Sequence, residues 1–451
     1  TVLTAGDSVY IRSGSYSERV VPRNSGTAAA EILYSNYPAE AVTVDGSAVV
    51  LAGFQGLFHI GGKNHIRVSG IRVQDAGPDL QTPGFLVMAC NFVTVQSCST
   101  YNTRSSGIGV WNSENIIVEG CDISLACNDG GQECLSVAQS ASVIVRNNVV
   151  RDGGPGTNGG EGIDVKDGSS TVWVYNNQVY NLNRLGIYVE AWDKYTANVW
   201  VYKNISRNNA ANGMAVATEN GGLLDNVWIY NNVAYGNWWS GFSVGGYGIP
   251  NNHYIQNLRV YNNTFFDNGK SGWGYGLQVD NDQASSITIV NNISSQNFSG
   301  QIENTASGAG LRVDNNLVFG PNTFNGTNPI LLNPLFVNAA ANDLHLQAGS
   351  PALDAADTTP VALDDADGTA RPIGIREDIG AFEYGTAFSV TPSYTATPSS
   401  TPSSLYFYDG EPGSSPFSIG STGGGDADDT VLEVSSPTYA GIGAMRFDFV
   451  N

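Results

Sequence analysis

Charged residues are scarce in this chain, and basic residues are the scarcer kind. Charged side chains make up 14% of the 451 residues, and 41 acidic residues against 20 Lys and Arg give a formal net charge of -21. A chain this acidic repels nucleic acid and anionic lipid surfaces, so we expect neither as a partner. It also lacks any apolar run of about 18 residues, so we expect no membrane span.

Cysteine and histidine are also rare. Five cysteines cannot all pair, and the four histidines are scattered without the spacing of a zinc site. Cys98 and Cys121 each end a copy of the repeat described below, where we expect small buried apolar residues. Cys127 and Cys134 share one loop, and their spacing leaves a disulfide and two thiols equally open. A zinc centre or a histidine base is therefore not expected.

The sequence instead contains a repeat. A motif of the form apolar-x-apolar-x-x-(Asn or Cys) occurs nine times between Val93 and Asn316, at intervals of 23 to 31 residues. Such self-similarity marks a solenoid, a propeller or a linear array, but propeller blades need longer units and leucine-rich repeats need leucines at fixed offsets. The copies, in order, are VTVQSC, IIVEGC, VIVRNN, VWVYNN, VWVYKN, VWIYNN, LRVYNN, ITIVNN and LRVDNN.

Each copy alternates apolar and polar residues, which is the pattern of a short strand with one buried side. After a polar turn a second strand of the form Gly-apolar-x-apolar follows, as in GIDV at 162 and GIYV at 186. Stacked coils align equivalent residues at roughly 4.8 Å, so the final asparagines from Asn148 to Asn316 should form a hydrogen-bonded ladder. The pattern predicts an all-β solenoid, a parallel β-helix, over residues 1–338.

The whole pattern resembles the right-handed parallel β-helix superfamily, which contains pectate lyases, polygalacturonases and many other polysaccharide-active enzymes. The resemblance implies a polysaccharide as partner and a secreted or cell-surface location in a bacterium. A stretch rich in Ser, Thr and Pro between residues 389 and 404 is consistent with secretion.

The last part of the chain has a different character. Residues 333–384 resemble the terminal segment of bacterial surface β-helix proteins, often called a choice-of-anchor type Q region, and we expect residues 339–386 to cap the helix. Within it, Asp364, Asp365 and Asp367 are either a calcium site or turn residues that pair with Arg371 and Arg376. Residues 387–404 have the composition of an extended linker, and residues 405–451 that of a partial β-sandwich or carbohydrate-binding segment.

Charges gather at one place on the second strands. The residue between the two apolar positions points outward, so Asp164 and Lys166 of one coil should lie beside Tyr188 and Glu190 of the next. The rest of this predicted face is small or neutral, which favours a functional site over a solvated charge patch. We expect Tyr188 to contact the substrate together with residues of the adjoining turns, namely Glu161, Asp167, Arg184, Trp192, Asp193 and Glu219.

Glycoside hydrolysis needs two carboxyl groups, one protonated as general acid and one ionised as nucleophile or base. Asp164 and Glu190 would lie one coil and one register step apart, at about 5 to 9 Å, a range that includes retaining and inverting geometries. Repulsion among the carboxylates should raise one pKa, while Lys166 keeps a neighbour ionised. We therefore predict a glycoside hydrolase that requires no cofactor, with Asp164, Glu190 and Lys166 as catalytic residues.

A second interpretation is β-elimination by a lyase. The segments EGIDVKDGS and LGIYVEAW are similar to the catalytic stretch of β-helix alginate lyases, in which a lysine is the base, and Lys166 matches that position. The resemblance fails at Glu190, where that family has an arginine. Such a lyase would need Ca²⁺, held by Glu161, Asp193 or Glu219, to offset the repulsion of a uronate.

A third class, a non-catalytic polysaccharide-binding or self-assembling protein, depends on aromatic residues of the first strands. Trp173, Trp200 and Trp228 fall in one outward column, and tyrosines fall in the next. An exposed band of this size is rare on a soluble monomer. Its rings either stack on sugars or are covered by a loop, the linker or a second copy of the chain.

Overall fold

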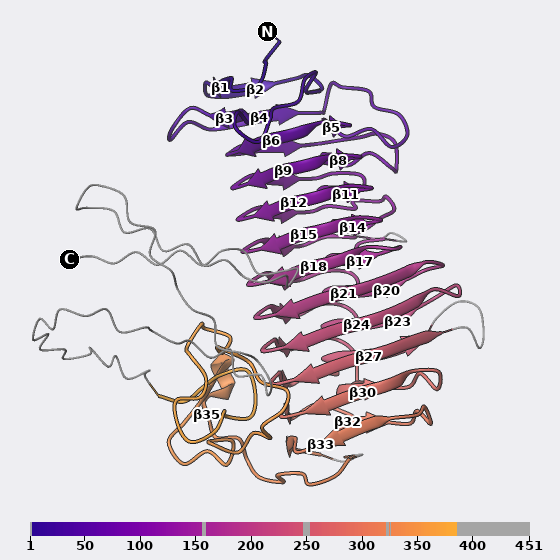
Figure 1. Ribbon diagram of the computed structural model, residues 1–451, viewed down its shortest axis with the longest axis vertical. Helices are drawn as coiled ribbons and strands as arrows, with labels where there is room; N and C mark the ends of the chain where they lie inside the picture. Colours follow the sequence, from indigo (N-terminus) through magenta and orange to yellow (C-terminus); the bar gives the residue numbers. More distant parts are fainter. Residues whose placement is uncertain (1, 156–158, 247–252, 322–323, 325, 386–451) are drawn as a thin grey trace, which may run out of the picture. The chain divides into compact units, whose positions relative to one another are not determined.

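The computed structural model describes residues 2–155, 159–246, 253–321, 324 and 326–385, all within the first of two compact units, Thr1–Phe388. The second unit, Ser389–Asn451, lies outside the described residues, as do the predicted linker and the predicted C-terminal β-rich segment. The described chain coils into a stack of parallel strands (Figure 1), which confirms the predicted fold class. No helical segment of these residues has the length and apolar character to cross a membrane.

Three parallel sheets, counted over the described residues, form the walls of the solenoid. Sheet A consists of β1 (Ser8–Ile11), β3 (Ile32–Asn36), β6 (Asn64–Ser69), β9 (Asn91–Gln96), β12 (Glu114–Glu119), β15 (Ala141–Arg146), β18 (Ser170–Tyr175), β21 (Tyr195–Tyr202), β24 (Leu223–Tyr230), β27 (Tyr254–Tyr261), β30 (Ser285–Val290) and β33 (Leu311–Asp314). Sheet B consists of β2 (Gly14–Tyr16), β4 (Val42–Asp45), β7 (Ile71–Gln74), β10 (Ser99–Tyr101), β13 (Asp122–Ser124), β16 (Val149–Arg151), β19 (Gln178–Tyr180), β22 (Ile205–Arg207), β25 (Val233–Tyr235), β28 (Thr264–Phe266), β31 (Ile293–Ser295) and β34 (Leu317–Phe319). Sheet C consists of β5 (Phe58–Gly61), β8 (Phe85–Met88), β11 (Ile108–Trp111), β14 (Leu135–Ala138), β17 (Ile163–Lys166), β20 (Ile187–Ala191), β23 (Met214–Thr218), β26 (Phe242–Gly246), β29 (Tyr275–Val279) and β32 (Gly300–Asn304).

Strand alternation separates the core from the surface. In β18 and β21 the side chains of Val172, Val174, Val199 and Val201 point inward and are fully buried, and they pair in register along the stack. Burying one such side chain stabilises the fold by roughly 1.5 to 3 kcal/mol. The interior is a continuous column of apolar residues, so each coil is stabilised by its neighbours rather than by itself.

The turn from sheet A to sheet B explains the paired asparagines of the repeat. Asn176 has a φ of 55°, a left-handed conformation that Asn tolerates better than most residues. The next residue, Asn177, points inward, and its Nδ2 donates to Val145 O and to Asn204 Oδ1, each at 3.0 Å. Equivalent contacts between successive asparagines recur from Asn148 to Asn316 and confirm the predicted ladder.

Cysteines continue this column in the earlier coils. Cys121 donates its backbone N–H to Asn148 Oδ1 at 2.9 Å, and its Sγ contacts backbone carbonyls of the core. All five cysteines belong to the described residues and are buried thiols, so no disulfide joins Cys127 to Cys134.

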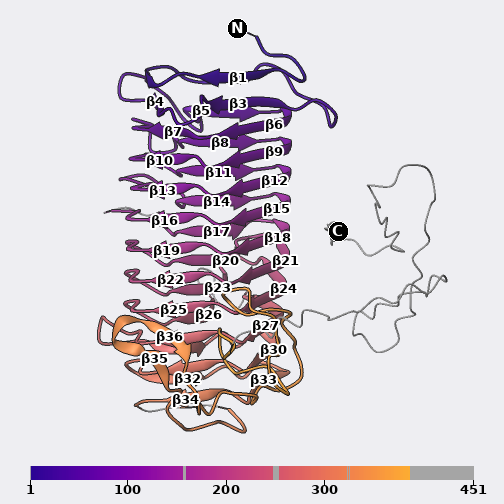
Figure 2. The same cartoon turned by 90° about the vertical axis from the view of Figure 1, so that its left-hand side faces the viewer.

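Residues 333–385 do not cap the end of the stack. They lie along its side, next to the later coils (Figures 1 and 2), and contain β35 (Phe336–Asn338), the 3-10 helix η1 (Ala339–Ala341) and β36 (Asp343–Leu346). Their apolar residues Leu344, Ala352 and Ile379 form a core with Ile293 and Leu317 of sheet B. The last coil is covered instead by residues 324, 327 and 330, which form isolated β-bridges to β32, β33 and β34. The predicted role of residues 339–386 as an end cap is therefore wrong.

Candidate active site

The predicted charge cluster lies on the outer face of sheet C. Strands β17, β20 and β23 pair in parallel so that Asp164, Tyr188 and Ala215 form one outward row. Lys166 and Glu190 lie two positions further along β17 and β20, in the next outward row, to which Trp111 and Ala138 of the preceding coils also belong. The structure thus brings together, from neighbouring coils, the four residues that the register predicted.

Lys166 is the centre of this cluster. Its Nζ lies 2.6 Å from Glu133 Oε1 and 3.9 Å from Asp164 Oδ2. The same Nζ lies 5.7 Å from the centre of the Trp111 ring. Burial lowers the pKa of Lys166, but attraction by Glu133 and Asp164 outweighs burial, so the pKa is raised overall. Lys166 therefore keeps its positive charge at neutral pH.

Glu133 is a site residue that the sequence analysis missed. It lies on the turn before β14, and its Oε2 accepts a hydrogen bond of 2.8 Å from Ser136. The strand that follows carries only small outward residues, so a count of charges along the strands does not include it. A comparison of the turns could have found it, because Glu161 occupies the equivalent position before β17.

The two predicted catalytic carboxyl groups are deeply recessed, with exposed fractions of 2% for Asp164 and 5% for Glu190. Burial, reinforced by the negative charge of Asp167, raises the pKa of Glu190 to about 9. Burial, followed by repulsion from Glu133, raises the pKa of Asp164 well above its usual range. Asp164 Oδ1 and Glu190 Oε2 are buried acceptors that have no hydrogen-bond partner within the described part of the chain, which is uncommon for buried polar atoms.

Two further pairs lie beside the cluster, one on the turns that precede the strands and one between β20 and the turn after β23. Arg184 Nε lies 2.8 Å from Glu161 Oε1. Burial, with added repulsion from Glu133, raises the pKa of Glu161 to about 7. On β20, Tyr188 donates its hydroxyl proton to Glu219 Oε1 over 2.7 Å. These predicted substrate contacts are therefore engaged with one another around the rim of the cluster.

The turns that follow the strands form the opposite rim. Burial raises the pKa of Asp167, and the positive charges of Lys166 and Lys194 oppose this rise. Asp193 lies close enough to add repulsion at Asp167. Trp192 is 44% exposed on the turn after β20. Asp167 is therefore part of the cluster, whereas Trp192 faces solvent beside it.

The tryptophan column predicted from the first strands lies on sheet A, away from these rows of sheet C. Trp173 and Trp200 stack with ring centres 5.3 Å apart, and Trp200 and Trp228 with ring centres 4.8 Å apart. Arg259 also lies over the Trp228 ring, at 5.2 Å. Because both faces of Trp200 are occupied by neighbouring rings, the prediction that it stacks on a sugar is wrong. The column instead joins successive coils.

The three aspartates suggested as a calcium site have separate partners. Asp364 pairs with Lys203 at 2.5 Å, and Asp367 pairs with His345 at 2.7 Å. Asp365 accepts the backbone N–H of Asp367 at 3.0 Å. No group of three or more metal-ligating side chains converges among the described residues, so these aspartates do not form the suggested calcium site.

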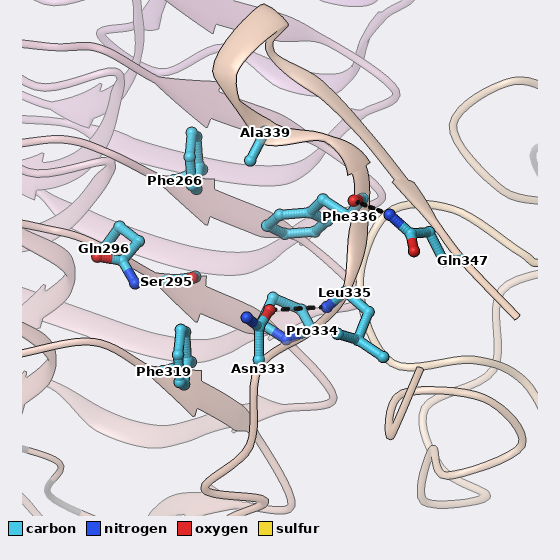
Figure 3. Close-up of a pocket in the computed structure, with 10 residues that line it drawn as sticks. All are labelled: Phe266, Ser295, Gln296, Phe319, Asn333, Pro334, Leu335, Phe336, Ala339 and Gln347. Atoms are coloured by element: carbon cyan, nitrogen blue, oxygen red, sulfur yellow. Dashed lines mark hydrogen bonds between the residues drawn. The ribbon is translucent and has the colours of Figure 1, made fainter. Parts of the chain in front are cut away.

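Two of the cavities formed by the described residues lie between the solenoid and residues 333–385. The larger has a volume of about 410 Å³ and is lined by Phe266, Phe319 and Phe336 among other neutral residues (Figure 3). Gln347 Nε2 donates to the Phe336 carbonyl at its edge, at 2.7 Å. The smaller, of about 290 Å³, lies beside Lys203. The larger cavity has no titratable group among its lining residues, so we interpret it as a gap in the packing between the solenoid and residues 333–385 and not as a catalytic site.

Comparison with known proteins agrees with this architecture. Residues 37–197 and 158–318 match the family described as "Right handed beta helix region", and the chain belongs to this family. Over 72 residues the chain is 38% identical to the uncharacterized protein YwoF of Bacillus subtilis (strain 168). That match covers 16% of this chain and spans only 15% of the length of the relative.

Several solved structures resemble this chain at low sequence identity. An exopolygalacturonase from Thermotoga maritima matches with a TM-score of 0.53 at 13% identity, over 69% of this chain and 84% of that chain. Pectate lyase Pel9A matches with a TM-score of 0.46 at 16% identity, over 84% and 88% of the two chains. The A-module of a mannuronan C-5 epimerase from Azotobacter vinelandii matches with a TM-score of 0.46 at 12% identity, over 73% and 91%. At 13% identity the likeness to the exopolygalacturonase shows the fold alone.

Proposed function

We propose that this protein is a secreted carbohydrate-active enzyme that hydrolyses glycosidic bonds of a polysaccharide. The observation that carries the proposal is the pair Asp164 and Glu190 on neighbouring coils of one sheet. Each has a raised pKa and one buried oxygen without a partner among the described residues. Glycoside hydrolysis requires two such carboxyl groups, and here the cation of Lys166 lies beside them.

Glu190 is the general acid in this proposal. With a pKa of about 9 it keeps its proton at neutral pH and can donate it to the leaving oxygen. Asp164 is the nucleophile or the base. Burial disfavours its charge, but Lys166 lies 3.9 Å from its Oδ2 and favours the ionised form. Two interacting carboxyl groups lose their protons in separate steps, which allows one of them to serve as acid and the other as base.

Elimination by a lyase is less well supported. Lys166 would have to lose its proton to act as the base, whereas Glu133 and Asp164 keep it protonated. Glu161, one of the carboxylates expected to hold Ca²⁺ in a lyase, is paired with Arg184. Lys166 therefore fits an electrostatic role better than a basic one.

Product analysis on a panel of polysaccharides tests the proposal. Hydrolysis predicts new reducing ends and products whose mass includes one added water per cleaved bond. Asp164→Asn and Glu190→Gln should each lower the rate on the order of 10² to 10⁴ fold. The control Glu114→Gln alters an exposed carboxylate on β12 of sheet A and should leave the rate unchanged.

Two other outcomes would replace the proposal. An unsaturated product that disappears in Lys166→Ala would establish elimination. Retention of a polysaccharide without any cleavage would establish a non-catalytic binding protein.

A further inference from the structure

A second group of large aromatic side chains is exposed on the surface. Trp238, Trp239, Trp273 and Phe298 have exposed fractions of 54%, 44%, 46% and 59%. They lie on three successive turns, those that precede β26, β29 and β32 of sheet C. We call these four residues the aromatic turn patch. Single exposed apolar side chains are common on protein surfaces, but several that are grouped on one part of a surface usually mark a binding site.

Backbone contacts between coils hold the patch in place. The Trp239 N–H donates to Ala211 O at 3.1 Å, which ties its turn to the preceding coil. A Cβ at Gly274 would come within 2.5 Å of the Trp239 backbone, so the glycine allows the next turn to pack directly against it. The rings of Trp239 and Trp273 meet edge to face, with centres 6.4 Å apart and planes at 82°. Rings held in this way lose little freedom when a ligand binds.

The patch continues the row of turns that holds one rim of the acidic cluster. Glu133, Glu161 and Arg184 occupy the turns before β14, β17 and β20. Trp239 occupies the turn before β26, two coils after Arg184. At the usual strand spacing, two coils correspond to roughly 10 Å along the axis. An oligosaccharide that lies along sheet C can therefore reach both places.

The charges along this path favour a neutral glycan. The acidic cluster contains the carboxyl groups of Asp164, Glu133, Glu161 and Asp167, in addition to Glu190, which is protonated in the proposed mechanism. Its cations Lys166 and Arg184 are both engaged by carboxylates. Near the patch, Lys270 is paired with Asp267 at 2.5 Å. A uronate polymer would meet a surplus of negative charge here, whereas the flat apolar side of a neutral sugar can stack on an aromatic ring.

We propose that the aromatic turn patch is a subsite for a neutral polysaccharide. Its sugar rings stack on Trp239 and Trp273, while a glycosidic bond further along the chain lies at Asp164 and Glu190. The inference rests on the proposed hydrolase function and specifies the class of its substrate.

Calorimetric binding to the full chain tests this subsite. The chain carries Asp164→Asn to prevent turnover, and the probes are oligosaccharides of xylose, glucose and mannose, with oligogalacturonate as the charged probe. We expect a neutral probe to bind, and the pair Trp239→Ala with Trp273→Ala to weaken binding by about tenfold or more. The matched control, Tyr10→Ala, removes an aromatic side chain that is 53% exposed on β1 and should have no effect. Circular dichroism confirms that each variant is folded.

Three results would overturn the inference: preference for oligogalacturonate, no binding of any probe, or equal affinity in the tryptophan variants. A change of sedimentation in those variants, without a change in sugar affinity, would assign the patch to contact with a second copy and would also overturn it. Cleavage assays separate the two proposals. If neutral polymers are cleaved equally by the parent and by the variant without the two tryptophans, the subsite proposal is wrong and the hydrolase proposal is retained. If binding depends on the tryptophans but no polymer is cleaved, the subsite proposal is retained and the hydrolase proposal is wrong.

Discussion

The buried carboxyl groups of sheet C couple the stability of the protein to pH. Glu190 keeps its proton in the folded chain up to a pKa of about 9, whereas a solvated glutamate ionises near 4.5. The raised pKa means that the folded state binds this proton more tightly than the unfolded state does. Its contribution to stability is therefore fully present below about pH 4.5 and is lost as the pH rises towards about 9.

Glu190→Gln should make unfolding less dependent on pH, because the amide stays neutral throughout. At about pH 8 we expect the variant to be more stable than the parent by roughly 1 to 3 kcal/mol, and at about pH 4 equally stable. Thermal unfolding followed by circular dichroism at both pH values measures this difference. Glu114→Gln serves as the exposed control, and a gain of the same size at both pH values would contradict the linkage.

Lys166→Ala should destabilise the fold through the carboxylates it leaves behind. Without the ammonium group, Glu133 and Asp164 are buried without a counter-charge at neutral pH, which costs roughly 3 to 5 kcal/mol. The loss should shrink in acid, because Asp164, whose pKa is raised by burial, takes up a proton there. Denaturant unfolding at two pH values measures it, and Lys166→Arg, which keeps the charge, should retain most of the stability. A loss that is independent of pH would mean that Lys166 acts by packing alone.

At the residue scale, the strands were predictable and the turns were not. Asp164 and Glu190 could be placed because strand alternation and register determine which side chains share a face. Glu133 and Trp239 lie on turns of variable length and sequence, where no period assigns a direction to a side chain. The pattern also placed Trp200 in one outward column with Trp173 and Trp228, but it did not show that the neighbouring rings cover both faces of Trp200.

Among the elements, two asparagine ladders run through the stack, of which sequence reasoning found one. The second follows the turn between sheets B and C and consists of Asn209, Asn237, Asn268 and Asn297. Each lies five residues after an asparagine of the first ladder. That constant offset was a usable signal, although the irregular turns that follow it obscure the repeat. Both ladders satisfy backbone groups at the corners, where no sheet hydrogen bonds are available.

Asn204→Ala should be strongly destabilising, because this side chain satisfies two backbone groups of the preceding coil. Its Nδ2 donates to Val174 O at 2.9 Å, and its Oδ1 accepts the Asn177 N–H at 3.0 Å. Loss of both partners in a buried corner should lower the free energy of unfolding by roughly 2 to 5 kcal/mol, measured by denaturant titration. Asn176→Gly is the control, since glycine accepts the left-handed φ of that position and should change stability by less than about 1 kcal/mol. Similar losses in both variants would assign the ladder no special role.

For the molecule as a whole, the repeat was sufficient to predict the solenoid, since each coil buries its apolar face in the same way. The position of residues 333–385 was not predictable. The outward asparagines Asn231, Asn262 and Asn291 bond to this segment, at Asp364 O, Glu377 and Asp357 O respectively. Their counterparts in earlier coils, such as Asn176, have the same identity and backbone conformation. Nothing in the repeat therefore distinguishes a covered corner from an open one.

This side contact leads to a prediction about truncation. A chain that ends at Leu332 would expose Ile293, Leu317 and Phe266, which are buried against residues 333–385, and would leave the covered asparagines without their partners. We expect such a chain to unfold at a lower temperature and to aggregate, because a newly exposed apolar face favours association. A chain that ends at Phe388, the limit of the first compact unit, should unfold at the temperature of the full chain. Light scattering during thermal unfolding compares the three, and a monomeric chain ending at Leu332 with unchanged stability would show that the solenoid folds independently of its flank.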